Sequence, residues 1–151
     1  TISLRNTKYQ PTRNSNLDEW YKVYQELKNS KFRPIVIPCF EDYMGDRLFA
    51  NYDWEIFAPA VLDNDLRLAL YEKALDNLCI NNGSQTLLIH SDCRYKYFKW
   101  LTEGGDIASA EHHKKTFDIN PGENFAFATE SGQDLFWETD NADVILKALD
   151  L

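Results

Sequence analysis

One stretch of the sequence, Leu78-Cys79-Ile80-Asn81-Asn82-Gly83-Ser84-Gln85-Thr86-Leu87, joins a short apolar run to a polar turn and then to a second apolar run. This pattern is typical of a parallel strand that leads into a helix in an α/β protein. The start of such a helix carries unpaired backbone N–H groups, and a glycine there lets an anion approach the backbone. We therefore expect a phosphate group at the turn 81–84. The alternative is a turn that binds no ligand.

Strands and helices alternate on both sides of this stretch. Because such alternation implies a parallel sheet, we predict an α/β, Rossmann-like fold whose sheet is flanked by helices on both faces. At 151 residues the chain is expected to form a single domain. The predicted strands cover residues 1–5, 34–40, 78–80, 94–100 and 133–137, and the predicted helices cover residues 17–29, 65–77 and 84–91, with a last helix capped by Thr139 or Asp140.

Composition and charge exclude several classes of protein. Hydrophobic residues make up 44% of the chain, which is not a disordered composition, and the net charge of −8 argues against general binding to nucleic acids or anionic membranes. The three cysteines lie in or beside apolar runs, which indicates free thiols in a reducing, cytoplasmic compartment. No apolar run reaches the roughly 18–20 residues of a transmembrane segment. Because the sequence begins without Met and enters a strand almost at once, we expect a fragment of a longer protein.

Polar clusters follow the first three strands, and their carboxyl ends should meet at one edge of the sheet. An arginine offers a fork of donors to phosphate oxygens, and a carboxylate after the second strand can accept hydrogen bonds from ribose hydroxyls. Such a site needs no metal ion. The candidate nucleotide-sugar-binding residues are Arg5, Arg13, Asn14, Ser15, Glu41, Asp42, Asn81, Asn82, Gly83, Ser84 and Thr86.

Each cluster also has an alternative interpretation. The arginines could pair with surface carboxylates, Glu41 and Asp42 could be solvated loop charges, and the two asparagines could only shape a turn. The pair His112-His113 has no metal-ligand spacing around it, so we expect both side chains to be solvated. The absence of G-x-G-x-x-G, P-loop, G-x-S-x-G and C-x-x-C motifs argues against the usual dehydrogenase, P-loop, α/β-hydrolase and thioredoxin classes.

The order of these segments resembles a known family. It runs from the strand bearing Arg5, through the loop 13–16 to Trp20, then to an acid after the second strand, the helix 66–74 and the turn 81–84. This arrangement resembles the C-terminal, donor-binding half of GT-B glycosyltransferases, especially heptosyltransferase-like and related bacterial surface-carbohydrate biosynthesis proteins. The resemblance covers roughly residues 1–100. Three residues depart from the family turn Asp-Ser-Gly-Pro-x-His, in which an acid, a proline and a histidine are replaced by Asn81, Ser84 and Thr86.

The resemblance implies a nucleotide-sugar-binding domain of a glycosyltransferase in surface or cell-envelope carbohydrate biosynthesis. It implies a nucleotide-diphosphate sugar as donor, no other cofactor, Arg13 opposite the leaving diphosphate, and an acceptor-binding domain or partner chain that supplies the catalytic residue. One alternative is a non-catalytic Rossmann-like binding or interaction domain. Another is a small nucleotide-processing enzyme that uses Glu41, Asp42 or Glu55. The sequence does not specify the base, the sugar, the acceptor or the oligomeric state.

Overall fold

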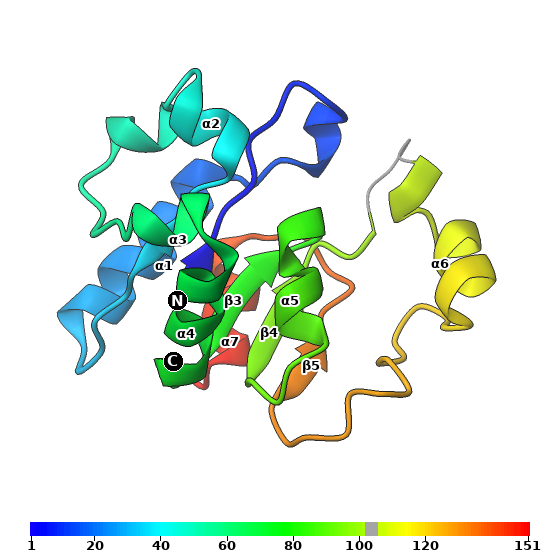
Figure 1. Ribbon diagram of the computed structural model, residues 1–151. Helices are drawn as coiled ribbons and strands as arrows, with labels where there is room; N and C mark the ends of the chain where they lie inside the picture. Colours follow the sequence, from blue (N-terminus) through cyan, green and yellow to red (C-terminus); the bar gives the residue numbers. More distant parts are fainter. Residues whose placement is uncertain (102–105) are drawn as a thin grey trace.

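The computed structural model describes residues 1–101 and 106–151, which form a five-stranded, entirely parallel sheet (Figure 1). This confirms the predicted α/β, Rossmann-like fold. The strands lie in the spatial order β2-β1-β3-β4-β5. Their bounds are β1 Ile2–Ser3, β2 Val36–Ile37, β3 Asn77–Ile80, β4 Tyr95–Phe98 and β5 Gln133–Leu135.

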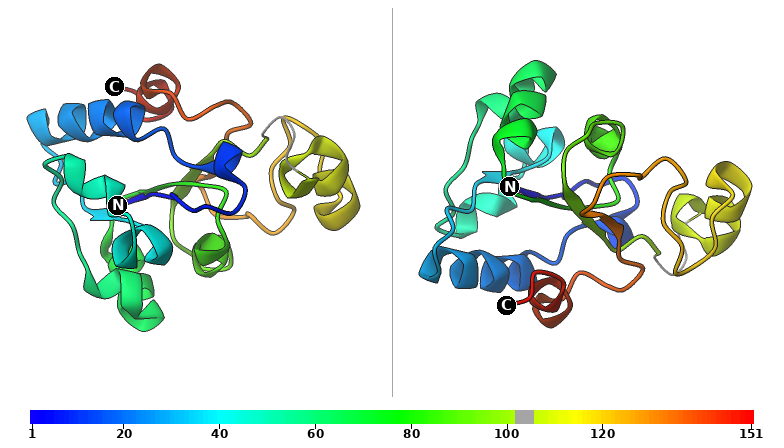
Figure 2. Two further views of the ribbon diagram at one scale, coloured as in Figure 1. Left: turned by 90° about the horizontal axis from the view of Figure 1, so that it is seen from above. Right: turned by 90° about the horizontal axis from the view of Figure 1, so that it is seen from below.

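Helices cover both faces of the sheet, as Figure 2 shows. On one face lie α1 (Leu17–Asn29) and α7 (Ala142–Ala148), and on the other lie α3 (Pro59–Leu62), α4 (Asn64–Lys73) and α5 (Thr86–Ile89). Alternate residues of each strand point to opposite faces, so Leu78 and Ile80 pack with α1 and α7, while Cys79 packs against α4 and α5. The short helix α2 (Phe40–Met44) follows β2, and α6 (Ala110–Phe117) lies beside the sheet.

Several predicted boundaries differ from the observed ones: the strands predicted over 1–5, 34–40, 94–100 and 133–137 and the helix predicted over 84–91 are shorter, and Phe40 begins α2 instead of ending a strand. Two further differences arise because side chains make other bonds. Helix α4 ends at Lys73, since Ala74 is extended. The side-chain Nδ2 of Asn77 donates to the carbonyl oxygens of Tyr71 and Arg94. The last helix is capped by Asn141, whose Oδ1 accepts from the Val144 amide at 2.9 Å.

The strand order places a topological switch point between β1 and β3. From β1 the chain crosses through α1 to β2 on one side, and from β2 it returns through α3 and α4 on the opposite face to reach β3. In sheets of this order, ligands bind in the crevice beyond the carboxyl ends of the strands at such a point. The fold therefore brings the segments after β1, β2 and β3 together at one edge.

The buried carboxylate of Asp140 links segments at this edge on the face that α1 and α7 cover. Asp140 is 1% exposed, and its Oδ2 accepts from the Asn16 amide at 2.8 Å and from the Trp20 indole at 2.9 Å. Its Oδ1 lies 3.2 Å from the ammonium of Lys99, which follows β4 and also donates to the carbonyl oxygen of Asn14. One side chain thus joins the start of α1, the end of β4 and the segment before α7.

We expect Asp140→Ala to lower the free energy of unfolding by about 3–5 kcal/mol, because it leaves the Asn16 amide and the Trp20 indole without their buried acceptor and the Lys99 ammonium without its buried acid. Urea denaturation followed by circular dichroism measures the change. Asp134→Ala is the matched control, since Asp134 pairs with the β4 residue Lys96 but is 46% exposed, and it should cost less than about 1 kcal/mol. Equal losses in the two variants would contradict the anchoring role of Asp140.

His113 of α6 is buried, so the expectation that both histidines are solvated is wrong for this one. Its ring stacks on Trp100 with centroids 4.5 Å apart, and its Nε2 lies 2.9 Å from the Trp100 carbonyl oxygen. Burial lowers the pKa of His113 below its ordinary value of 6.5. The segment that carries α6 is therefore attached to the sheet through a neutral imidazole.

We expect this imidazole to make stability pH-dependent. The unfolded chain takes up the proton near pH 6.5, while the folded chain resists it, so the free energy of unfolding should fall as the pH drops below 6.5 toward the folded-state pKa. Urea denaturation between pH 5 and pH 8 measures this, with His113→Phe as the variant that retains the stack on Trp100. If the difference between the two proteins is the same at every pH, His113 does not titrate as described.

Candidate functional site

A hollow of about 380 Å³ lies at the switch point, at the carboxyl ends of β1, β2 and β3. Its walls come from four segments that are distant in the sequence. They include Thr7 after β1, Phe40 and Glu41 of α2, Arg67 of α4, and Asn82 and Ser84 after β3. The expected convergence of the segments after these strands is therefore observed. The arginine on the described walls, Arg67, is a residue to which the sequence analysis gave no role.

Arg67 is the buried cation of this hollow. It is 4% exposed, and its Nε donates to the carbonyl oxygen of Ala60 at 2.6 Å. Within residues 1–101 and 106–151, its two terminal nitrogens form neither a hydrogen bond nor an ion pair. Asp63 caps α4 by accepting from the amides of Asp65 and Leu66, and so fixes where this helix begins. Arg67 thus lines the hollow with a guanidinium whose Nε is hydrogen-bonded and whose terminal nitrogens have no partner among the described residues.

Arg5 and Arg13, both predicted phosphate ligands, are also buried near this edge, and both bind neutral acceptors. Arg5 donates to the carbonyl oxygens of Tyr9 and Gln10 and to the Asn14 side chain. Arg13 donates to the Gln10 side chain and, at 3.1 Å each, to the carbonyl and side-chain oxygens of Asn81. Burial lowers the pKa of both guanidinium groups. Neither side chain pairs with a surface carboxylate of the described residues.

Three buried arginines therefore lie on the loops and helices of this edge, and among the described residues none of them forms an ion pair. In contrast, Arg33 and Arg94, which lie toward the other edge, pair with Glu55 and Asp76. The chain as a whole carries a net charge of −8. The carboxyl edge thus brings together three arginines that lack ion-pair partners among the described residues and two acids, Glu41 and Asp42, that lack them as well.

Three predicted site residues are occupied by bonds within the loops. Asn14 Oδ1 accepts from Arg5 and from the Thr7 amide, and Ser15 Oγ accepts from the Arg5 amide at 2.9 Å. Asp42 is 3% exposed and accepts from the Asn6 side chain and from the amides of two residues that follow α2, Leu48 and Phe49. These side chains shape the loops around the hollow.

Glu41 and two residues of the 81–84 turn reach the hollow itself. Glu41 lines it while Oε1 accepts from the Lys8 amide at 3.0 Å, and Asn82 and Ser84 line it from the opposite side. Gly83 begins a short 3-10 helix and has open space where a side chain would lie, since no atom comes within 4 Å of that point. Thr86 donates its hydroxyl to the Gly83 carbonyl oxygen at 2.8 Å and so supports the turn.

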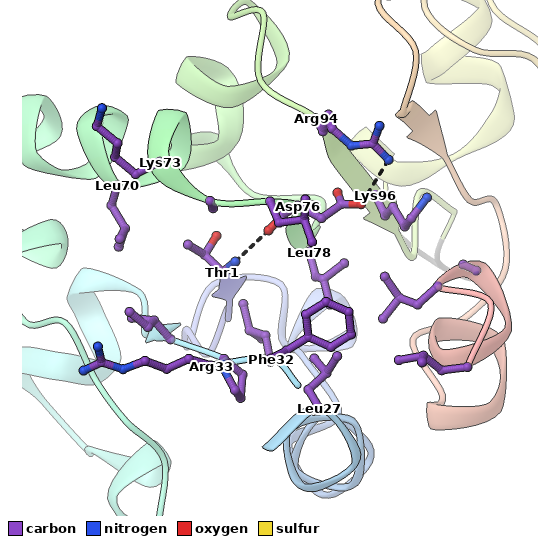
Figure 3. Close-up of a pocket in the computed structure, with 18 of the residues that line it drawn as sticks. Thr1, Leu27, Phe32, Arg33, Leu70, Lys73, Asp76, Leu78, Arg94 and Lys96 are labelled. Carbon is purple, nitrogen blue, oxygen red and sulfur yellow. Dashed lines mark hydrogen bonds and ion pairs between the residues drawn. The ribbon is translucent and has the colours of Figure 1, made fainter. Parts of the chain in front are cut away.

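A larger hollow of about 660 Å³ lies at the opposite edge, around the amino ends of β1 and β3 (Figure 3). Its interior is mainly apolar, with Leu27, Phe32 and Leu78 on the walls. Two cations at its rim have acidic partners: Arg94 lies 3.8 Å from Asp76, and Lys96 lies 3.4 Å from Asp134. This hollow lies at the amino ends of the strands, away from the switch point.

Other kinds of site have no support in the described part of the chain. It contains no group of three or more His, Cys, Asp or Glu side chains that could hold a metal ion. Its helices are all too short or too polar to cross a membrane. Cys39, Cys79 and Cys93 are free thiols. The hollow at the switch point is therefore the candidate functional site.

In comparisons with known proteins, no family model, no curated protein and no solved structure matches this chain. The functional argument accordingly rests on the chemistry of the hollow and on the segment order described above. The residues that sequence reasoning missed are Thr7, Phe40 and Arg67. The sequence does contain one indication that Arg67 is buried. It lies four residues before Tyr71, which places both side chains on one side of α4.

Proposed function

We propose that this chain binds a nucleotide-sugar in the hollow at the switch point, as the donor-binding domain of a glycosyltransferase in surface or cell-envelope carbohydrate biosynthesis. The observation that carries the proposal is the set of three buried arginines at this edge that form no ion pair with any of residues 1–101 and 106–151. A buried cation without an acid is costly unless a ligand supplies the missing charge. A diphosphate has the charge and the acceptor oxygens to do so.

Each wall of the hollow has a part in this proposal. Arg67 presents two terminal nitrogens that have no partner among the described residues, and its fork of donors suits phosphate oxygens. Asn82 and Ser84 offer polar groups beside the open backbone of Gly83. Glu41 is the carboxylate on the described walls, and it suits ribose hydroxyls. Arg13 acts as a positioning residue, because its bonds to Asn81 hold the turn.

In glycosyl transfer the leaving diphosphate gains negative charge as the sugar bond breaks. A guanidinium already in place at that charge lowers the barrier without reorganisation, which is the role we propose for Arg67. The acceptor would come from another domain or a partner chain, which would also supply the catalytic base. The free cysteines accord with a reducing, cytoplasmic location.

A second candidate is nucleotide binding without transfer. It is favoured by one observation: Asn81 and Thr86, at the positions where the resembled family has an acid and a histidine, are engaged with Arg13 and with the Gly83 carbonyl. Binding is common to both candidates, so a binding experiment tests the shared part first.

We expect Arg67→Gln to weaken the binding of UDP-, GDP- or ADP-sugars roughly 10- to 100-fold, since it removes a charged donor to phosphate. Isothermal titration calorimetry measures the dissociation constant. Gly83→Val should also abolish binding without destabilising the protein, because its side chain would project into open space that the phosphate needs.

Arg33→Gln is the matched control. Arg33 is an exposed arginine that pairs with Glu55 toward the opposite edge, and its loss should leave binding unchanged. Thermal unfolding of each free variant separates loss of a contact from loss of the fold. If the wild-type protein binds none of these nucleotides, or if Arg67→Gln binds them as well as the wild type, the proposal is wrong.

A further inference from the structure

We infer that the hollow binds its nucleotide in one orientation, with the base stacked on Phe40 and the phosphates at Arg67, so that Phe40 is the residue that selects nucleotides over other phosphates. This inference rests on the proposed function and adds the place and the chemistry of the base. It is carried by the different character of the segments that line the hollow. The segment after β2 provides the aromatic Phe40 and the acidic Glu41, while the segment after β3 provides the polar Asn82 and Ser84, and α4 provides the cation of Arg67.

Phe40 provides the aromatic end. It is the first residue of α2, directly after β2, and its side chain lines the hollow although it is 59% exposed. The preceding residue, Cys39, is fixed to β1 because its sulfur lies 3.1 Å from both the amide nitrogen and the carbonyl oxygen of Asn6. The backbone that carries the ring is thus anchored. An exposed aromatic face on a fixed backbone is a stacking platform for a base.

Glu41 shows which end cannot hold the phosphates. Its carboxylate lies on the same wall as Phe40, where the Lys8 amide donates to it. The Lys8 ammonium lies 3.7 Å from Asp46, so this cation pairs with Asp46 and not with Glu41. A carboxylate repels a phosphate but accepts hydrogen bonds from the hydroxyls of a ribose. The Phe40 end therefore suits the nucleoside.

The polar groups that would hold the phosphates lie on the β3 side, where Asn82 and Ser84 line the hollow. Arg67 reaches the hollow from α4 and is held by the bond from its Nε to the carbonyl oxygen of Ala60, the neighbour of Val61. Since β1 lies between β2 and β3, the carboxyl ends of β2 and β3 are two strand spacings apart, about 10 Å. An extended nucleotide spans such a distance, whereas a phosphate ion does not.

The hollow also limits how strictly the base is selected. Its volume of about 380 Å³ is near the lower end for ligand pockets, which fits one nucleotide. Beside Phe40 the wall includes the apolar side chain of Val61. Stacking on a phenylalanine face tolerates every base, because each has a π-face. We therefore expect ADP, GDP and UDP to bind with similar affinities.

The test compares these three nucleoside diphosphates with pyrophosphate by isothermal titration calorimetry. Phe40→Ala should weaken the three nucleotides roughly 5- to 100-fold and leave pyrophosphate unchanged, because only the stacked base is lost. Phe40→Trp should retain the affinity for nucleotides. Met44→Ala is the matched control, since Met44 lies one turn further along α2, is 63% exposed and does not line the hollow.

The outcomes separate this inference from the proposed function. If nucleotides bind and depend on Arg67, but Phe40→Ala binds them as well as the wild type, the base lies elsewhere and only the inference fails. A loss of pyrophosphate binding equal to the loss of nucleotide binding in Phe40→Ala would show that the ring has a structural role, which also overturns the inference. If no nucleotide binds to the wild-type protein, the proposed function fails and the inference fails with it.

Discussion

The buried carboxylate of Asp140 is the contact on which the carboxyl edge of the sheet depends. The strands β1 and β2 contain two residues each, so their ladder bonds alone fix little of the segments that follow them. Asp140 binds the Asn16 amide, the Trp20 indole and the Lys99 ammonium, and Lys99 binds the Asn14 carbonyl oxygen in turn. Because the charge is buried and three groups from two segments contact it, losing any one of these contacts is costly. The loop that carries Arg5 and Arg13 is held in this way.

Much of the fold follows from local pattern. Helix α1 begins and ends as predicted, because its apolar residues recur at helical spacing and Asn16 precedes them at the N-cap. The centres of the first four strands were also predictable, since short apolar runs between helices indicate buried parallel strands. The position of the candidate site at the carboxyl edge then follows from topology.

The side chains that make the site were less predictable, and α4 shows why. Its leucines suggest that the helix packs on the sheet with its leucine side chains. In the structure Leu66 is 44% exposed, while Arg67 and Tyr71 are buried. Tertiary contacts decide this: the Tyr71 hydroxyl bonds to Ser3 and Gln85, and Arg67 bonds to Ala60. Likewise, Asp42 looks like a ribose ligand in sequence, but its partners lie in the loop after α2 and next to β1, at distances along the chain that no pattern specifies.

Charge distribution gives the strongest physical reason to regard this edge as a binding surface. An acidic chain with 24 carboxylate residues has ample means to neutralise three arginines, and it does so for Arg33 and Arg94 but, among the described residues, not for Arg5, Arg13 or Arg67. Arg5 and Arg13 bind carbonyl and amide oxygens, which fix the positions of the guanidinium groups. In the described part of the chain the two terminal nitrogens of Arg67 have no partner, although Glu41 lines the same hollow. Buried guanidinium groups of fixed position that form no ion pair with the described acids suit an anion that arrives from solution.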